Sequence, residues 1–382
     1  MKTIPCRILA VLLVILLSFS TLAILPINAQ VEDSWTSLAS MKEARYGLGV
    51  VTENGKIYAI GGNPEGKPTS DINEEYNPQT NTWTNKTRIP EPMSDFGIAV
   101  YHGKIYCFNG ETGNTYAYTP LYDTWEQKAS LPNPRTGIVA NTLNDKIYVM
   151  GGVLSTLDVY NPLNDSWTTK APLNGGLTAG NGASVVFEGK IHVFGAVPRE
   201  FSNQIYDPET DTWSKGEPLI DGYYFTAAGV TTGANAPKRI YVFGADKRLW
   251  TIDTPNLTSQ SYDPKTGNWT RIETIPSGHL MGGVATIDDK IYVIGGAGAG
   301  YSQTLYANRL CRLYTPIEYG TSDPTYTPIP ATPTPSPTPT PTPNPTPEPE
   351  FPTTIVVASV IILGIVAIGI ISYYKKNRKN KI

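Results

Sequence analysis

The sequence between residues 31 and 319 repeats one unit six times, and each copy contains three spaced elements. The first copy has the tripeptide Lys56-Ile57-Tyr58, the small pair Gly61-Gly62, and Tyr76 two residues before a proline. The tripeptide returns at 104–106, 146–148, 190–192, 239–241 and 290–292, the small pair at 109–110, 151–152, 195–196, 244–245 and 295–296, and the Tyr-x-Pro tyrosine at 118, 160, 206, 262 and 314. Self-similarity at a fixed spacing of this length indicates a repeat architecture.

Each copy predicts a four-stranded antiparallel sheet. Residues 47–51 are small enough for a crowded centre, residues 53–55 suit a turn, and residues 56–60 read as a second strand. Residues 76–83 read as strand, turn and strand, with Asn, Pro and Thr in the turn. One such sheet cannot bury both of its faces, whereas six in a ring can. With 35 Gly and 33 Pro for turns, and only 16% charged residues, the sequence predicts an all-β, six-bladed propeller and excludes a coiled coil.

The ring is expected to close through the N-terminal segment. In the first five copies a Trp stands seven residues after the motif tyrosine, at positions 83, 125, 167, 213 and 269. The sixth copy ends at Tyr314-Thr315-Pro316 with no Trp after it, while Asp33-Ser34-Trp35 precedes the first copy without a tyrosine partner. We therefore predict that this segment supplies the outer strand of blade six, which removes an exposed sheet edge.

These repeats resemble the kelch family of β-propellers over roughly residues 31–319, because the diglycine, the Tyr and the Trp of the kelch motif recur together. The resemblance implies a kelch-type propeller. The sequence departs from the family pattern at Asn109, at the alanines of the small pairs in copies four and five, at His192 in place of Tyr, and at the missing last Trp.

The two ends predict export and a membrane anchor. Residues 1–29 read as a signal peptide, with Lys2 and Arg7 before an apolar run and a small residue, Ala29, at the cleavage position; an uncleaved N-terminal anchor is the alternative. Residues 353–374 include 21 uncharged residues and predict one transmembrane helix, followed by a basic tail at 375–382 that should remain cytoplasmic. This gives a single-pass protein of the cell membrane whose propeller, residues 30–319, lies outside the cell.

The segment 320–352 between propeller and membrane predicts an extended stalk. It is rich in Thr-Pro repeats, and alternating prolines prevent both helices and strand ladders. As a polyproline II spacer, the 29 residues 324–352 of this segment extend about 90 Å at about 3.1 Å per residue. Binding of a partner by the Pro-rich segment is the alternative to a stalk with glycosylatable threonines.

The sequence predicts neither a catalytic set, nor a metal site, nor a cofactor. Gly61-x4-Gly66-Lys67 has the spacing of a phosphate-binding loop, but Pro68 stands where Ser or Thr should be and no helix is expected to follow. The three histidines, His102, His192 and His279, are expected at different levels of the blades. Cys107 and Cys311 fall on non-adjacent blades and are expected to be unpaired. A net charge of −3 excludes a basic footprint for nucleic acid.

The candidate ligand site lies at one end of the ring. The loop that follows the diglycine and the loop that enters the innermost strand share one face, which by resemblance is the usual functional side of kelch propellers. The candidate ligand-binding residues there are Arg45, Asp95, Arg135, Tyr223, Tyr224, Trp250 and His279. Such a polar and aromatic rim suits carboxylates or sugars, while structural hydrogen bonding by the arginines is the alternative.

The leading hypothesis is a cell-surface binding or adhesion module that presents this loop face to an extracellular glycan or protein, anchored in the membrane by its C-terminal helix. The alternative is an exported kelch-type isomerase or oxidase of sugars or sugar acids that uses Arg45, Arg135 and His279. N-glycosylation sequons occur at Asn85, Asn164, Asn256 and Asn268.

Overall fold

The computed structural model describes residues 31–152, 155–173, 182–195, 202–221, 223–246, 257–276, 279–299 and 305–323. The chain divides into two units, residues 1–332 and 333–382, and all described residues belong to the first. The predicted signal peptide, transmembrane helix, basic tail and nearly all of the predicted stalk lie outside the described residues. Among those that are described, no helix has the length and apolar character needed to cross a membrane.

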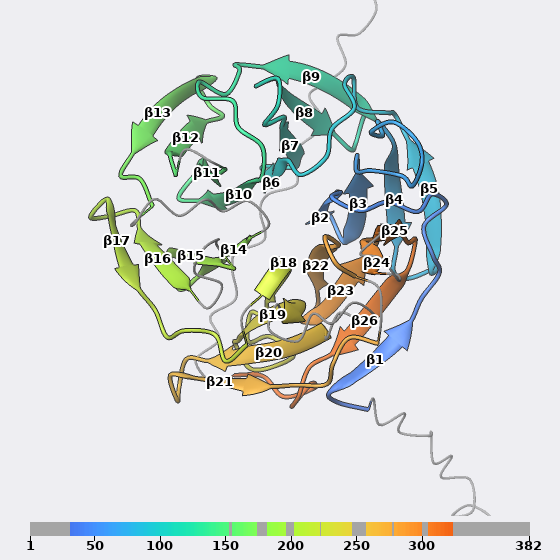
Figure 1. The fold of residues 1–382 in the computed structure, drawn as a ribbon, viewed down its shortest axis with the longest axis vertical. Helices are drawn as coiled ribbons and strands as arrows, with labels where there is room; N and C mark the ends of the chain where they lie inside the picture. Colours follow the sequence, from blue (N-terminus) through green and yellow to red (C-terminus); the bar gives the residue numbers. More distant parts are fainter. Residues whose placement is uncertain are drawn as a thin grey trace, which may run out of the picture. The chain divides into compact units, whose positions relative to one another are not determined.

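Six four-stranded antiparallel sheets form a ring, as the repeats predict (Figure 1). Blade one contains β2 (Gly49–Glu53), β3 (Lys56–Ile60), β4 (Asn73–Asn77) and β5 (Thr82–Lys86); blade two contains β6 (Gly97–Tyr101), β7 (Lys104–Phe108), β8 (Thr115–Thr119) and β9 (Thr124–Lys128). Blade three contains β10 (Ile138–Leu143), β11 (Lys146–Gly151), β12 (Leu157–Asn161) and β13 (Ser166–Lys170); blade four contains β14 (Ala183–Phe187), β15 (Lys190–Phe194), β16 (Asn203–Asp207) and β17 (Thr212–Lys215). Blade five contains β18 (Tyr223–Val230), β19 (Ile240–Asp246), β20 (Leu257–Asp263) and β21 (Asn268–Arg271).

Blade six is built from both ends of the propeller. Its strands are β22 (Gly283–Ile287), β23 (Lys290–Ile294), β26 (Cys311–Thr315) and, outermost, β1 (Ser34–Ser37). β1 pairs antiparallel with β26, so that Trp35 lies opposite Tyr314 in the same register as Trp83 opposite Tyr76 in blade one. The predicted N-terminal closure is confirmed. A short hairpin of β24 (Ala297–Ala299) and β25 (Leu305–Ala307) is inserted between β23 and β26.

A recurring set of hydrogen bonds joins consecutive blades at the motif tryptophans. Each Trp indole Nε1 donates to a backbone carbonyl of the segment that leads from the preceding blade into the tryptophan's own blade. The residue two before the Trp accepts from the motif tyrosine hydroxyl wherever that residue is Asn or Asp. The tryptophan bonds are Trp83 to Ala39, Trp125 to Thr87, Trp167 to Ala129, Trp213 to Ala171, Trp269 to Glu217 and Trp35 to Glu273, at 2.7–3.1 Å. The tyrosine bonds are Tyr76 to Asn81, Tyr118 to Asp123, Tyr160 to Asp165, Tyr206 to Asp211 and Tyr314 to Asp33. Blade five has Gly267 at this position and lacks that carboxylate.

The hydrophobic core lies between the blades. One cluster joins Tyr76 and Trp83 of blade one to Tyr292 and Leu313 of blade six, and comparable clusters fill the other junctions. Each blade therefore depends on its neighbours to bury its faces, which explains why a full ring is needed.

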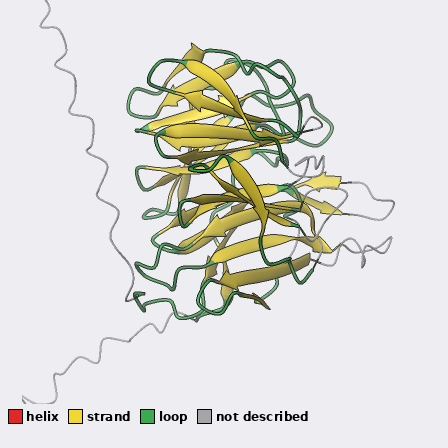
Figure 2. Cartoon of the chain, turned by 90° about the vertical axis from the view of Figure 1, so that its left-hand side faces the viewer, coloured by secondary structure: helices red, strands yellow, loops and turns green. Residues whose placement is uncertain are grey.

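The two faces of the ring differ in their loops. Antiparallel order places the loops between the second and third strands and the connections between blades on one face, which we call the long-loop face. The turns between first and second and between third and fourth strands lie on the other, which we call the short-turn face. Figure 2 shows the ring from the side. Because β26 ends and β1 begins at the paired residues Thr315 and Ser34, both ends of the propeller lie at the short-turn face.

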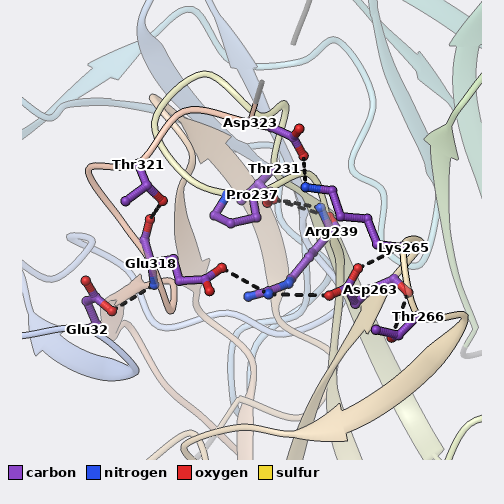
Figure 3. Close-up of polar contacts among 10 residues, drawn as sticks. All are labelled: Glu32, Thr231, Pro237, Arg239, Asp263, Lys265, Thr266, Glu318, Thr321 and Asp323. Carbon is purple, nitrogen blue, oxygen red and sulfur yellow. Dashed lines mark hydrogen bonds and ion pairs between the residues drawn. The ribbon is translucent and has the colours of Figure 1, made fainter. Parts of the chain in front are cut away.

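One long connection interrupts the short-turn face. Residues 231–239, between β18 and β19, pack against residues 316–323, and we call this pair of segments the C-terminal clasp (Figure 3). The Gly320 and Asp323 amides donate to the carbonyls of Asn235 and Gly233 at 2.6 and 2.8 Å. Arg239 contacts Glu318 at 3.1 Å, as Figure 3 shows. Gly320 and Asp323 fall within the predicted stalk, so the first residues of that segment are fixed to blade five.

Candidate functional site

Arg45 lies inside blade one and bonds to that blade. It stands in the connection that enters β2 and is fully buried. Its Nη2 donates to Glu74 at 2.8 Å and to the Ala59 carbonyl at 3.2 Å, and its Nη1 donates to the Gly61 carbonyl. Burial lowers the pKa of the guanidinium, and the nearby Glu74 carboxylate opposes this. The arrangement fits a structural cross-link between β3 and β4.

Arg135 repeats this arrangement in blade three. Its Nη1 contacts Asp158 at 2.8 Å, and both side chains are fully buried. Its Nε donates to the Gly151 carbonyl at 2.8 Å and its Nη2 to the Val149 carbonyl at 3.3 Å. The structure thus places the two arginines in separate blades, each with its own acid, and does not bring them together in one pocket.

His279 takes the corresponding place in blade six. Its ring Nδ1 donates to the Gly295 carbonyl at 2.8 Å, which is the counterpart of the bond from Arg135 to Gly151. Burial lowers the pKa of His279 to about 4, so the imidazole is neutral at pH 7. Its Nε2 is buried and has no hydrogen-bond partner among the described residues.

Asp95 lies between blades one and two. Its backbone is left-handed, with φ of 49°, and its amide donates to the Gly47 carbonyl at 2.9 Å. Burial raises the pKa of the carboxyl group to about 6, partly offset by a hydrogen bond from Ser94. A side chain on Gly47 would strike this carboxylate, with 2.8 Å between its Cβ and Asp95 Oδ1. Gly47 also has a left-handed φ of 63°, so both its backbone and this contact favour glycine there.

The aromatic candidates are placed only in part. Tyr223 and Tyr224 begin β18, opposite Asp246 and Ala245, and the register shifts between Tyr224 and Ala227. Trp250 lies outside the described residues. Of the sequon asparagines, Asn85, Asn164 and Asn268 are exposed, while Asn256 lies outside the described residues.

A central cavity of about 540 Å³ runs between the innermost strands. Residues of β2, β6, β10, β14, β18 and β22 line it, and its polar groups are hydroxyls and an amide such as Thr52, Thr286, Ser184 and Asn141. Among the described residues that line the cavity, none has a charged side chain. This cavity is not among the sites predicted from the sequence, although the small residues of the inner strands are consistent with an open centre.

The cysteines and the metal-ligand residues are also placed. Cys107 and Cys311 are unpaired and buried, and burial raises the pKa of both thiols, that of Cys311 to about 12. Within the described ranges, no three His, Cys, Asp or Glu side chains gather as a metal site would need.

Comparison with known proteins supports the identity of the repeat. The Kelch motif matches residues 44–88 and 134–174, and a second form of the same motif matches residues 180–219. The chain therefore contains kelch repeats. These matches cover blades one, three and four, and the ring geometry extends the same unit to all six blades of this kelch-repeat protein.

Two individual proteins are similar to it. The Kelch-like protein terF of Aspergillus terreus is 33% identical over 101 residues, which are 24% of this chain and 20% of that protein. The chain thus matches about a fifth of that relative's length. A solved structure titled "Structure of YjhT" aligns with a TM-score of 0.57 at 15% identity, covering 72% of this chain and 97% of that one. This second likeness concerns the fold alone.

Proposed function

We propose that this kelch-repeat protein is a cell-surface binding module that presents its long-loop face to an extracellular glycan or protein. The observation that carries the proposal is the asymmetry of the ring. Both ends of the propeller lie at the short-turn face, with Asp323 bonded to blade five on that side. A tether that continues from there leaves the long-loop face open to a partner.

The loops of the long-loop face have the variety that recognition requires. Loops carry binding residues because they vary while a rigid scaffold holds them. The loop between β3 and β4 spans residues 61–72, that between β7 and β8 spans only residues 109–114, and blade six adds the β24–β25 hairpin. Tyr306 on this hairpin is 46% exposed and lies opposite Gly298. Exposed tyrosines are common anchors in binding surfaces.

The alternative of a sugar-acid enzyme has less support. It would require Arg45, Arg135 and His279 to act on one substrate, whereas they belong to blades one, three and six, and both arginines are bonded to buried acids. Fold alone does not decide between binding and catalysis.

The proposal is tested by blocking one face at a time in the full-length protein displayed on cells. Lys67→Cys places a thiol on the long-loop face of blade one, and Gln79→Cys places one on the short-turn face of the same blade. Both native side chains are exposed, and the native Cys107 and Cys311 are buried. Each variant is labelled with a maleimide polyethylene glycol of about 5 kDa, and binding to a printed glycan array and to an extracellular-protein library is scored.

We expect binding by unlabelled cells, its loss after labelling at residue 67, and its retention after labelling at residue 79. Binding that is lost only after labelling at residue 79 contradicts the choice of face. Absence of any ligand in both collections contradicts the binding function. Resistance of the propeller to protease added outside intact cells contradicts the cell-surface location.

A further inference from the structure

Blade six carries a chemically altered version of the junction that blades one and three close with an ion pair. In blades one, three and six, a Cβ placed on the second glycine of the small pair would contact the same position of the entering segment. The contacts are Arg45 at 3.2 Å from Gly62, Arg135 at 2.8 Å from Gly152, and His279 at 2.8 Å from Gly296. The acids occupy equivalent strand positions as well. Glu74 pairs with Ala59 and Asp158 with Val149, and in blade six Arg312 pairs with Val293 in this register.

The altered junction therefore has a basic side chain at both of the positions that form the ion pair in blades one and three. Where blades one and three bring arginine to a carboxylate, blade six has His279 at the arginine position and Arg312 at the carboxylate position. Arg312 is half-buried, its Nη1 donates to the Ser37 hydroxyl of β1, and its positive charge disfavours protonation of His279. Figure 1 shows the strands concerned, β23, β26 and β1, side by side.

Three buried nitrogens at this junction have no hydrogen-bond partner in the part of the chain that the structure describes. They are Nε2 of His279, Nδ2 of Asn308 and Nε of Arg312. The backbone holds Asn308 at this junction. Its backbone N–H donates to the Gly296 carbonyl at 2.9 Å, and its backbone carbonyl accepts from the Arg45 N–H at 2.9 Å. Buried polar atoms in native proteins are nearly always bonded, so unbonded ones call for a missing partner.

The chemistry of these atoms defines that partner. Asn308 Nδ2 and Arg312 Nε carry hydrogens and can only donate. His279 donates through Nδ1 to Gly295, which leaves a lone pair on Nε2 of the neutral ring. Two donors with a positive charge suit a carboxylate, and the acceptor suits a hydroxyl group.

We propose that the blade-six junction of His279, Asn308 and Arg312 binds a small carboxylate that carries a neighbouring hydroxyl group. The carboxylate takes the place of the acid that Glu74 and Asp158 supply in blades one and three, and the hydroxyl donates to His279 Nε2. This inference deepens the proposed function, since it names a ligand class for the long-loop face.

The test measures the thermal midpoint of the full-length protein in detergent micelles against increasing lactate. Methyl lactate, which lacks the charge, and acetate, which lacks the hydroxyl, are the ligand controls. We expect lactate to raise Tm in a saturable way, acetate to bind at least about tenfold more weakly, and methyl lactate to give no shift. A shift that is absent or does not saturate means that the junction holds only water, and it overturns the proposal.

Three variants locate the effect. Arg312→Gln should abolish the lactate shift, while Arg88→Gln removes an equal charge from an exposed site and should retain it. The double variant His279→Arg with Arg312→Glu rebuilds the pair of blade one, so it should fold and yet lose the shift. Lactate binding by the double variant equal to that of the wild type overturns the assignment. The face-blocking result does not depend on lactate, so this site and the proposed function can fail separately.

Discussion

Trp35 should contribute more to stability than an equivalent tryptophan elsewhere in the ring, because it fastens the only strand that closes it. Trp167 of blade three is the matched control. Trp35 lies 5.5 Å from Phe243 at 73° and 5.1 Å from Tyr314 at 46°, and Trp167 lies 5.5 Å from Phe108 at 75° and 5.0 Å from Tyr160 at 46°. Each indole donates one bond of 3.0 Å to a carbonyl.

Local loss of contacts is thus the same for Trp35→Ala and Trp167→Ala. The free energy of unfolding should fall by about 3 kcal/mol in each variant from this local loss. This is the low end of the range for Trp to Ala, because both rings are only half-buried. The strand of Trp167 is held by the chain on both sides. β1 has only four paired residues, and ordering each costs about 1–2 kcal/mol, which net hydrogen bonds of about 1 kcal/mol barely offset. Without Trp35 the strand should detach and expose β26.

The assay is thermal unfolding by near-UV circular dichroism, with hydrogen exchange of the β26 amides. About 3 kcal/mol corresponds to a decrease in Tm of roughly 6–12 °C in Trp167→Ala, and Trp35→Ala should lose clearly more and also lose protection in β26. Deletion of residues 31–38 should open or unfold the ring. Equal decreases in Tm with protected β26 amides, or a deletion variant that melts at the wild-type temperature, would refute the reasoning.

Three further predictions concern buried groups. Glu74→Gln leaves the Arg45 charge buried without its counterion and should cost about 3–5 kcal/mol in chemical denaturation, whereas an unchanged midpoint would show that the pair contributes nothing. The raised pKa of Asp95 means that the folded state binds the extra proton, so its contribution to stability falls as the pH rises from about 4 to about 6. Asp95→Asn should remove that part of the pH dependence, and identical stability profiles of wild type and variant would contradict it. Cys107 and Cys311 should react with a thiol reagent only after unfolding, and rapid labelling of the native protein would contradict their burial.

The repeats made the ring and its closure predictable from sequence. The unmatched Trp35 and the unmatched Tyr314 identified the strand pair because each blade needs both residues at one junction. Packing of this kind follows from spacing alone, so no long-range information was required.

The rim was harder to interpret, since sequence shows which residues share a level of the ring but not which way their side chains turn. Arg45 and Arg135 suggested a ligand site, and the structure turns both into their own blades. A signal for this was present: only these two copies place an acid two residues before the motif tyrosine, at Glu74 and Asp158. Copy six has a positive charge, Arg312, at this position in place of an acid. The sequence alone therefore already shows that the junction of blade six differs from those of blades one and three.

The C-terminal clasp bears on mechanical tension. β26 runs toward the short-turn face between β23 and β1, so a pull along the strand from its C-terminal end would shear both ladders at once rather than unzip them bond by bond. The bonds of Gly320 and Asp323 to blade five stand in front of those ladders along the chain. Force from a tether would therefore reach blade five first, and the seam that closes the ring last.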